Sequence, residues 1–417
     1  MSALSLTTRA VVAAWTTLAV AGCGGTGGSA ASPAAAPTAL TCQTATPFAG
    51  APLHAAPPSS LFPATDLAAA SLGPLPKELG VLLDQKVRDI LQQTGAPAMT
   101  AAITIPGLGR WSSTQGLAQA IPPKPVNSDT EFYWGSVGKA FTAVLVLQLV
   151  EEGKLRLDDT LSRWYPQIPQ AERITLAQLL THTSGLPIHA LGASGLGTET
   201  PAQQVAVLAQ TPLLFCPGTH ASYSNAGYVL LGLVVEAVEQ RPFYQSVHHR
   251  IAAPLGLQHL RALRPGEDMP AALATPHAGR TPKADPGAWT RLGAGSVVAR
   301  AEDMVVFWQA VLSGRLLAPA TVQSQWTLLY QLFPTTTETN QGNRWFGMGV
   351  TLSEWTDSAG RARTWLGHGG HIPTADAVML YDPAANAYAA VAVNSDVQST
   401  PAANALLTTV MAWRAAH

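Results

Sequence analysis

Apolar residues recur at helical spacing near the start of the folded part of the chain, and strand-like runs follow them. From Glu78 to Gln93 apolar residues return every three or four positions, which predicts a helix that ends at Gly95. Two strands, Ala98–Ile105 and Arg110–Ala118, are predicted on either side of a turn that contains proline and glycine.

The C-terminal part repeats these patterns in the opposite order. Three strands are predicted at Arg363–Gly367, Ala375–Tyr381 and Ala387–Val393, and a last helix at Ala402–Ala416. We therefore expect one antiparallel sheet that is built from both ends of the chain and covered by the first and last helices.

The middle of the chain is mainly helical in its patterning. Helices are predicted at Ala140–Glu152, Ile174–His182, Ala202–Ala209 and Tyr228–Glu239. We expect a helical lobe from about residue 140 to residue 345, which gives an α+β protein of two lobes. A cleft between lobes is a common place for a binding site.

The N-terminus reads as an export signal. Arg9 is the only charged residue among the first 23, and an apolar run from Val11 to Val20 follows it. The end of this segment resembles the bacterial lipobox, in which Cys23 is lipidated; ordinary cleavage after Ala21 is the alternative. Residues 24–76 are rich in Ala, Pro and Gly and predict a tether. The folded domain would then span residues 77–417 of an exported, periplasmic, membrane-anchored protein.

Composition limits the classes of partner and leaves two cysteines to explain. The chain has 417 residues, 47% of them hydrophobic, so it can bury a large core. Its net charge of −1 provides no general attraction for nucleic acid. Apart from Cys23, the cysteines are Cys42 and Cys216. In an oxidising periplasm they can form a disulfide, and two separate thiols are the alternative.

Candidate chemistry first appears at Ser136 and Lys139. Residues three apart lie on one face of a helix, so the hydroxyl and the amine project together. Ser136 would lie in the first helical turn, where its backbone N–H has no partner within the helix. This combination suits acyl transfer, although a Ser-x-x-Lys spacing also arises by chance.

Two later segments carry further candidates. Tyr223 and Asn225 lie two apart before a helix, so both can face one side; a structural tyrosine and an Asx turn are the alternative. In Gly367-His368-Gly369-Gly370-His371, the glycines allow a ligand to approach the backbone closely. An edge strand there would offer the His371 N–H as an oxyanion donor beside that of Ser136, with His368 at the rim of the site. A simple glycine turn is the alternative.

Taken in order, these three segments resemble the motifs of the penicillin-recognising serine hydrolases. The resemblance extends to further stretches that are similar to the branch of class C β-lactamases and D-alanyl-D-alanine carboxypeptidases. These stretches are Gly153–Asp159, Leu179–Leu186, Pro217–Thr219 and Ala294–Ser296 with Asp303. The resemblance implies a β-lactamase/transpeptidase-like fold.

The same resemblance implies an acyl-enzyme mechanism that uses no cofactor or metal. Ser136 would be the nucleophile, and either Lys139 or Tyr223 its base. Asn225, His368, Gly369 and Gly370 would hold the substrate. The implied activity is D-Ala-D-Ala carboxypeptidase-type hydrolysis of a peptide or amide, with an esterase or a class C-type β-lactamase as alternatives. A non-catalytic lipoprotein that binds peptidoglycan or penicillin is an alternative of another class.

One position departs from the family pattern. Class C β-lactamases have lysine where this chain has His368, and a histidine is only partly protonated at neutral pH. Arg291 or Arg300 could supply a substitute cation for a substrate carboxylate. We expect His182, within the Leu-Leu-Thr-His-Thr-Ser-Gly-Leu stretch, to shape a loop. Trp134, Trp345 and Trp365 are candidates for the cleft or for the core.

Overall fold

The computed structural model describes most of the chain after residue 72. The described residues are 42, 44, 73–119, 122–190, 199–267, 287–325, 330–333, 344–356, 360, 362–372 and 374–417. The chain divides into two units, residues 1–41 and 42–417, and every described residue belongs to the second unit. The predicted signal segment, the lipidation site at Cys23 and most of the predicted tether lie outside the described residues.

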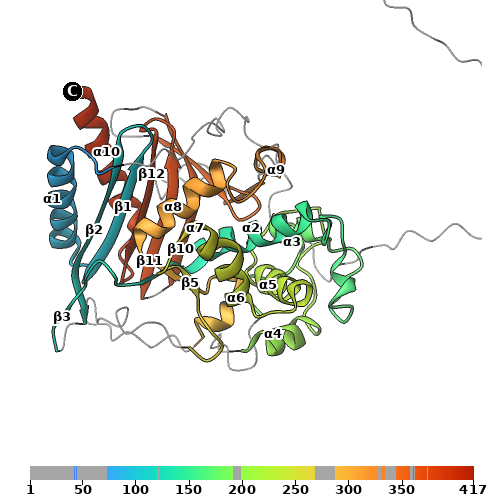
Figure 1. Cartoon of the computed structure of the whole chain (residues 1–417). Helices are drawn as coiled ribbons and strands as arrows, with labels where there is room; N and C mark the ends of the chain where they lie inside the picture. Colours follow the sequence, from blue (N-terminus) through green and yellow to red (C-terminus); the bar gives the residue numbers. More distant parts are fainter. Residues whose placement is uncertain are drawn as a thin grey trace, which may run out of the picture. The chain divides into compact units, whose positions relative to one another are not determined.

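Within the described residues, nine strands form one antiparallel sheet that joins both ends of the chain (Figure 1). In order across the sheet they are β3 (Lys124–Pro125), β2 (Gly109–Gln119), β1 (Ala98–Ile105), β12 (Ala387–Val393), β11 (Ala375–Asp382), β10 (Ala362–Ile372), β9 (Thr351–Thr356), β8 (Arg344–Phe346) and β7 (Tyr330–Phe333). β1 pairs directly with β12, with Ala101 opposite Val391. The predicted sheet from the two ends of the chain is thus confirmed.

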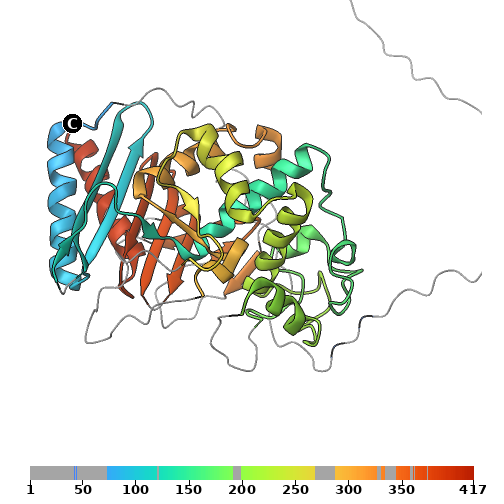
Figure 2. The same cartoon turned by 60° about the horizontal axis from the view of Figure 1, so that its bottom comes forward.

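Helices cover both faces of this sheet. α1 (Lys77–Thr94) and α10 (Ser399–Ala416) lie against one face, and α8 (Ala301–Leu312) lies against the other (Figures 1 and 2). Strand side chains alternate between the faces, so Ala101 packs in the core under α1 and α10, whereas Ala102 packs in the core that includes α8. Because both faces are covered, every residue of β1, β11 and β12 is buried.

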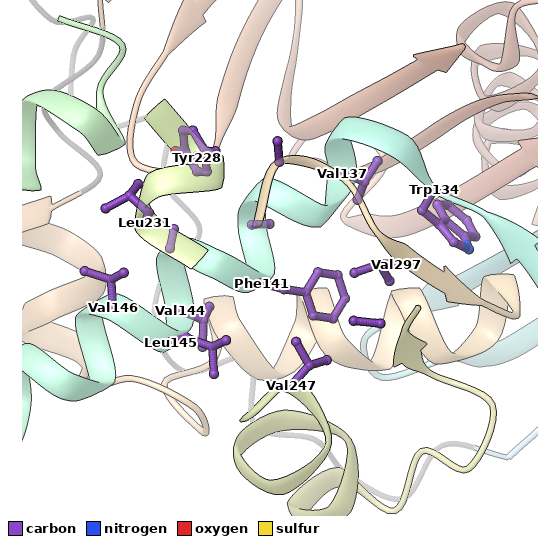
Figure 3. Packing of buried hydrophobic residues seen from close by; sticks show 14 of the residues in the cluster. Trp134, Val137, Phe141, Val144, Leu145, Val146, Tyr228, Leu231, Val247 and Val297 are labelled. Carbon is purple, nitrogen blue, oxygen red and sulfur yellow. The ribbon is translucent and has the colours of Figure 1, made fainter. Parts of the chain in front are cut away.

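The second lobe is built around α2 (Gly138–Glu151). This helix is apolar on almost all sides, which is typical of a helix inside a core. Phe141, Val144 and Leu145 of α2 lie among side chains of neighbouring segments, Val247 and Val297 among them (Figure 3). The other elements of this region are η2 (Gly135–Val137), η3 (Leu161–Arg163), α3 (Leu176–Leu180), α4 (Pro201–Leu208), α5 (Asn225–Glu239), α6 (Phe243–Val247), η4 (His248–Ala252), α7 (Ala253–Leu255), η6 (Trp289–Ala294) and α9 (Pro319–Gln325).

The structure differs from the predicted elements in three ways. The region from residue 140 to 345 also contains the short strands β5 (Arg261–Ala262) and β6 (Val297–Ala299), which form a small sheet with β4 (Phe132–Tyr133). α8 and strands β7 to β9 were not predicted. β10 continues through the glycine-rich motif to Ile372 instead of ending at Gly367.

Among the described helices, none combines the length and apolar character needed to cross a membrane. Cys42 and Cys216 form a disulfide, one of the two arrangements expected for them.

Candidate active site

Ser136 and Lys139 meet where the main sheet and α2 adjoin. Ser136 lies in the short helical turn η2, directly before α2, rather than within α2 itself. The Lys139 Nζ donates hydrogen bonds to Asn225 Oδ1 at 2.6 Å and to the Ala294 carbonyl oxygen at 2.7 Å, and it lies within hydrogen-bond distance of Ser136 Oγ, at 3.2 Å. The structure therefore brings together residues from three distant parts of the sequence.

The surroundings of Lys139 favour an uncharged amine. The side chain is completely buried, and each of its three hydrogen-bond partners is neutral. Burial lowers the pKa of Lys139 well below its ordinary value of 10.5, and the nearby positive charge of Arg291 lowers it further. An amine in this state can accept a proton.

Tyr223 lies beside both residues. The Lys139 Nζ is 4.8 Å from the centre of the Tyr223 ring, and the phenol hydrogen-bonds with Ser136. Burial raises the pKa of Tyr223 above its ordinary value of 10.0, and the bond with Ser136 offsets only part of this rise. The phenol is therefore protonated at neutral pH.

The glycine-rich part of β10 lies directly against the Ser136 turn. A Cβ atom at Gly370 would lie 2.1 Å from the Trp134 carbonyl oxygen and 2.9 Å from the Ser136 nitrogen, so only glycine fits. A Cβ atom at Gly135 would be 3.5 Å from the His371 nitrogen. The backbone N–H groups of Ser136 and His371 consequently lie near each other, as two oxyanion donors require.

Beyond Gly367 the glycine-rich segment lies at an edge of the sheet, as the sequence predicts. β10 pairs with β9 over Ala362–Gly367 and with β11 over Leu366–Ile372, so only Leu366 and Gly367 pair with a strand on each side. Among the described residues, β9 pairs with no residue of β10 beyond Gly367. The edge is therefore local and coincides with the motif, where Gly369 is exposed.

His368 is buried, so the prediction that it lies at the rim is wrong. Its side chain is 3% exposed, because alternation along β10 places it on the same face as Leu366, within the core between the lobes. Its Nδ1 donates to the Gly369 carbonyl oxygen at 2.6 Å. Burial lowers the pKa of His368 to about 3, and the positive charge of Arg344 also lowers it. The ring is neutral and cannot act as a cationic clamp.

His371 has a different environment from His368. Its side chain is exposed, and Nδ1 donates to Asp376 Oδ2 at 2.9 Å. The Asp376 carboxylate raises the pKa of His371, while its other oxygen accepts hydrogen bonds from the Ser399 N–H and hydroxyl. Thus the His371 backbone faces the Ser136 turn and its side chain is tied to the start of α10.

Comparison with known proteins places this site in a family. A family model described as Beta-lactamase matches residues 83–410. The chain belongs to the beta-lactamase family. The resemblance that the three motifs indicate is thereby confirmed.

Relatives in this family have different names. Penicillin-binding protein 4 of Amycolatopsis lactamdurans is 34% identical over 37% of this chain and 42% of its own length. Esterase EstB of Burkholderia gladioli is 34% identical over 48% of this chain and 54% of its own length. The chain thus spans about half the length of these two relatives.

A solved structure supports the fold of this beta-lactamase-family protein. D-amino acid amidase from Ochrobactrum anthropi SV3 superposes with a TM-score of 0.68 and 23% identity, over 81% of this chain and all of the amidase chain. At this level of identity the likeness shows the β-lactamase/transpeptidase-like fold.

The remaining candidate residues differ in whether they lie near the site. Arg291 donates to the Tyr133 hydroxyl at 3.1 Å and lies close enough to affect Lys139. Arg300 instead pairs with Asp303, at 3.0 Å. Trp365 is buried on the α1 and α10 side of the sheet, so it does not line the site.

The other two tryptophans also make packing contacts with the core. Trp134 is buried, and its indole donates to the Ala299 carbonyl oxygen at 3.0 Å. Trp345 packs against the core of the helical lobe.

Sequence reasoning did not find several residues near the centre of the site. The Ala294 carbonyl contacts Lys139 through a backbone atom, which no side-chain pattern reveals. His189 lies with its Nδ1 3.5 Å from Asn225 Nδ2. Phe346 stacks edge-on against Tyr223 and His368. The motif stretch Ala294–Ser296 was a usable signal for the first of these, because it marked the segment that reaches Lys139.

Proposed function

We propose that this protein is a serine hydrolase that forms an acyl-enzyme at Ser136. The observation that carries the proposal is the 3.2 Å hydrogen bond between Ser136 Oγ and the fully buried Lys139 amine, in surroundings that favour the neutral form. A serine hydroxyl is a weak nucleophile and needs an adjacent base. A neutral amine held at this distance meets that need.

In the proposed mechanism Lys139 is the base and Tyr223 carries protons. Ser136 Oγ attacks the substrate carbonyl carbon and gives its proton to Lys139, while the N–H groups of Ser136 and His371 hold the oxyanion. When the intermediate collapses, the leaving amine or alcohol receives a proton through Tyr223, which Lys139 replenishes. Water then attacks the acyl-enzyme by the same steps in reverse order. The raised pKa of Tyr223 supports this division, because a protonated phenol can donate.

We propose peptide or amide hydrolysis of the D-alanyl-D-alanine carboxypeptidase type as the main activity. The penicillin-binding relative and the order of the three motifs support this substrate class. Asn225 would hold the substrate amide, and the open edge of β10 at Gly369 and Gly370 would receive the substrate backbone.

Ester hydrolysis is the second candidate, and a specific observation favours it. His368 is neutral and buried, so no positive charge stands where class C β-lactamases have lysine. A small neutral ester does not need that charge, and the relative named esterase EstB agrees with this substrate class. The same observation weighs against a class C-type β-lactamase.

Parallel assays test these functions. The purified protein is incubated with a D-Ala-D-Ala peptide, p-nitrophenyl acetate and nitrocefin, and covalent adducts are followed by mass spectrometry. We expect turnover of the peptide or the ester, and a loss of about 10⁴-fold or more in Ser136→Ala. Ser128→Ala, at an exposed position, is the matched control.

The results of these assays distinguish the candidate functions. Turnover that survives Ser136→Ala contradicts the nucleophile assignment. Rapid nitrocefin hydrolysis favours the β-lactamase. Binding of penicillin or peptidoglycan without turnover or an adduct favours the non-catalytic lipoprotein.

We also propose that the protein is exported to the periplasm and anchored by a lipid on Cys23. The disulfide between Cys42 and Cys216 supports an oxidising compartment, where such bonds persist. Labelling with radioactive palmitate tests the anchor: wild type incorporates label and Cys23→Ala does not. Equal labelling of the two proteins contradicts the assignment.

A further inference from the structure

The loop that carries Tyr223 is fixed to one neighbouring stretch, residues 181–188, which we call the template segment. Backbone N–H groups of the loop donate to carbonyl oxygens of the template segment at four points. The bonds run from Leu214 to Gly185 at 2.8 Å, Gly218 to Thr183 at 2.8 Å, Ser222 to His182 at 2.9 Å and Asn225 to Ile188 at 2.9 Å. Tyr223 lies between the last two bonds.

The contact between the template segment and the loop is close enough to require glycine at position 185. Gly185 has a φ of +82°, and a Cβ atom there would lie 2.2 Å from the Phe215 carbonyl oxygen. The Leu179–Leu186 stretch of the family resemblance therefore has a structural basis, because it shapes the surface on which the Tyr223 loop lies.

His182 holds the backbone on both sides of Tyr223. Its carbonyl oxygen accepts the Ser222 N–H at 2.9 Å, and its ring Nδ1 accepts the Ser224 N–H at 3.0 Å. The ring also stacks on the Tyr223 ring, with centroids 4.5 Å apart and planes 29° from parallel. Three separate contacts from one residue thus fix the position of the phenol.

The state of His182 suits this arrangement. The side chain is 1% exposed, and the residue has a φ of +61°, which is uncommon for any residue except glycine. Because Nδ1 accepts a hydrogen bond, the proton of the neutral ring lies on Nε2. Burial, together with Lys139 and His368 nearby, lowers the pKa of His182 well below 6.5 and keeps the ring neutral.

We propose that His182 is a positioning residue that sets the Tyr223 phenol against Ser136, a role that rests on the proposed serine hydrolase function. Loss of the Nδ1 acceptor leaves the Ser224 N–H unpaired and frees the peptide that follows Tyr223. An apolar side chain would fill the same space but would not supply this acceptor. The position therefore requires an acceptor for the backbone, and the ring adds a stacking contact.

Two substitutions separate the ring from the acceptor. His182→Phe keeps an aromatic ring and removes the acceptor. His182→Asn removes the ring, keeps an acceptor near the place of Nδ1, and tolerates a positive φ. Asn394→Ala is the matched control, because Asn394 Oδ1 also accepts a buried backbone N–H, that of Ala98 at 2.8 Å, but in the main sheet.

Amide hydrogen exchange and steady-state kinetics are measured on the full chain and its variants. In His182→Phe we expect at least about tenfold faster exchange at Ser224 and a kcat about 10²-fold lower, with KM changed less than about threefold. We expect His182→Asn to restore slow exchange and most of kcat. Asn394→Ala should lower Tm and leave kcat at 25 °C unchanged.

Other results overturn the proposal. These are unchanged exchange and kcat in His182→Phe, or a kcat loss in Asn394→Ala as large as that in His182→Phe. If the wild-type protein hydrolyses no substrate, the proposed function fails. Exchange at Ser224 then still decides whether the His182 ring holds the loop, since faster exchange in His182→Phe supports this and unchanged exchange overturns it.

Discussion

Two basic side chains lie at opposite ends of helix α2 in contrasting surroundings. At its start, Lys139 is completely buried and contacts neutral acceptors. At its end, Arg250 donates to both oxygens of Glu152, the residue that caps α2, at 2.6 and 3.0 Å, and to both oxygens of Glu239, each at 2.7 Å. Burial lowers the pKa of Lys139, whereas the two carboxylates raise that of Arg250.

The comparison shows that the charge of the hydrogen-bond partners decides what a basic side chain can do. Neutral acceptors orient Lys139 without stabilising its positive charge, so its proton can leave. The carboxylates of Glu152 and Glu239 stabilise the positive charge of Arg250. This side chain therefore links the segments that carry the two glutamates and does not release a proton. The first arrangement suits proton transfer and the second suits stability.

The largest effect is expected from Lys139→Arg, which places a cation that cannot lose its proton in the site. We expect kcat/KM to fall about 10³-fold, since the general base is lost. Lys139→Met should show the same loss without the added bulk of the guanidinium, and circular dichroism checks that both variants fold. Lys154→Arg, at an exposed ion pair with Glu152, is the control. If Lys139→Arg keeps kcat/KM within tenfold of the wild-type value, Lys139 is not the general base.

A smaller effect, on stability alone, is expected from Arg250→Met. Removal of the guanidinium leaves Glu239, whose side chain is 5% exposed, without its main partner. We expect the free energy of unfolding to fall by about 3 kcal/mol, at the low end for a broken buried pair because Glu152 is partly exposed. Urea denaturation measures this change, and the kcat of the folded protein should not change.

The matched control for Arg250→Met is Arg156→Met. Arg156 pairs with Asp158 at 2.9 Å, but both side chains are largely exposed. We expect this change to leave the free energy of unfolding nearly unchanged, because solvent screens an exposed pair. Equal losses in the two variants would show that burial of the Arg250 network does not matter.

Acidic pH should weaken the ion pairs of Arg250 at the C-terminal end of α2. Arg250 lowers the pKa of Glu152 from its ordinary 4.5 to about 2 and also lowers that of Glu239. Because the folded pKa values lie below the unfolded ones, this stabilisation is complete above pH 4.5 and is lost as pH falls toward 2. Urea midpoints between pH 6 and pH 3 should therefore fall more steeply for wild type than for Arg250→Met, and parallel curves would contradict the assignment.

The smallest effect is expected from Arg291→Gln. The positive charge of Arg291 helps to lower the pKa of Lys139, so its removal raises that pKa. Since the base must be neutral, the acid limb of the kcat/KM profile should move to higher pH. Arg300→Gln, whose guanidinium faces Asp303, should leave the limb in place. An unmoved limb in Arg291→Gln would show that burial alone sets the state of Lys139.

Much of the fold follows from local patterns. Helix α1 was predicted because Leu79, Leu83 and Val87 form one apolar face that packs on the sheet. Strands β1, β11 and β12 were predicted because covered faces leave continuous apolar runs. The end of β10 at Ile372 was not predicted, because glycines have low strand propensity, and Gly370 is required for close packing against Trp134.

The site residues that act through their side chains could be predicted from the sequence. Those that act through backbone atoms could not. Ser136, Lys139, Tyr223 and Asn225 stand out by spacing, and the structure brings them together. The contact of Lys139 with the Ala294 carbonyl depends on a chain segment 155 residues away. Likewise, nothing local indicates that His368 is buried, because its surroundings come from both lobes.

The disulfide between Cys42 and Cys216 closes a covalent ring around a large part of the protein. A single peptide-bond cut anywhere between these two cysteines would leave both fragments joined through sulfur. Release of the folded domain from the N-terminal segment would then require reduction as well as proteolysis, unless the cut falls before Cys42.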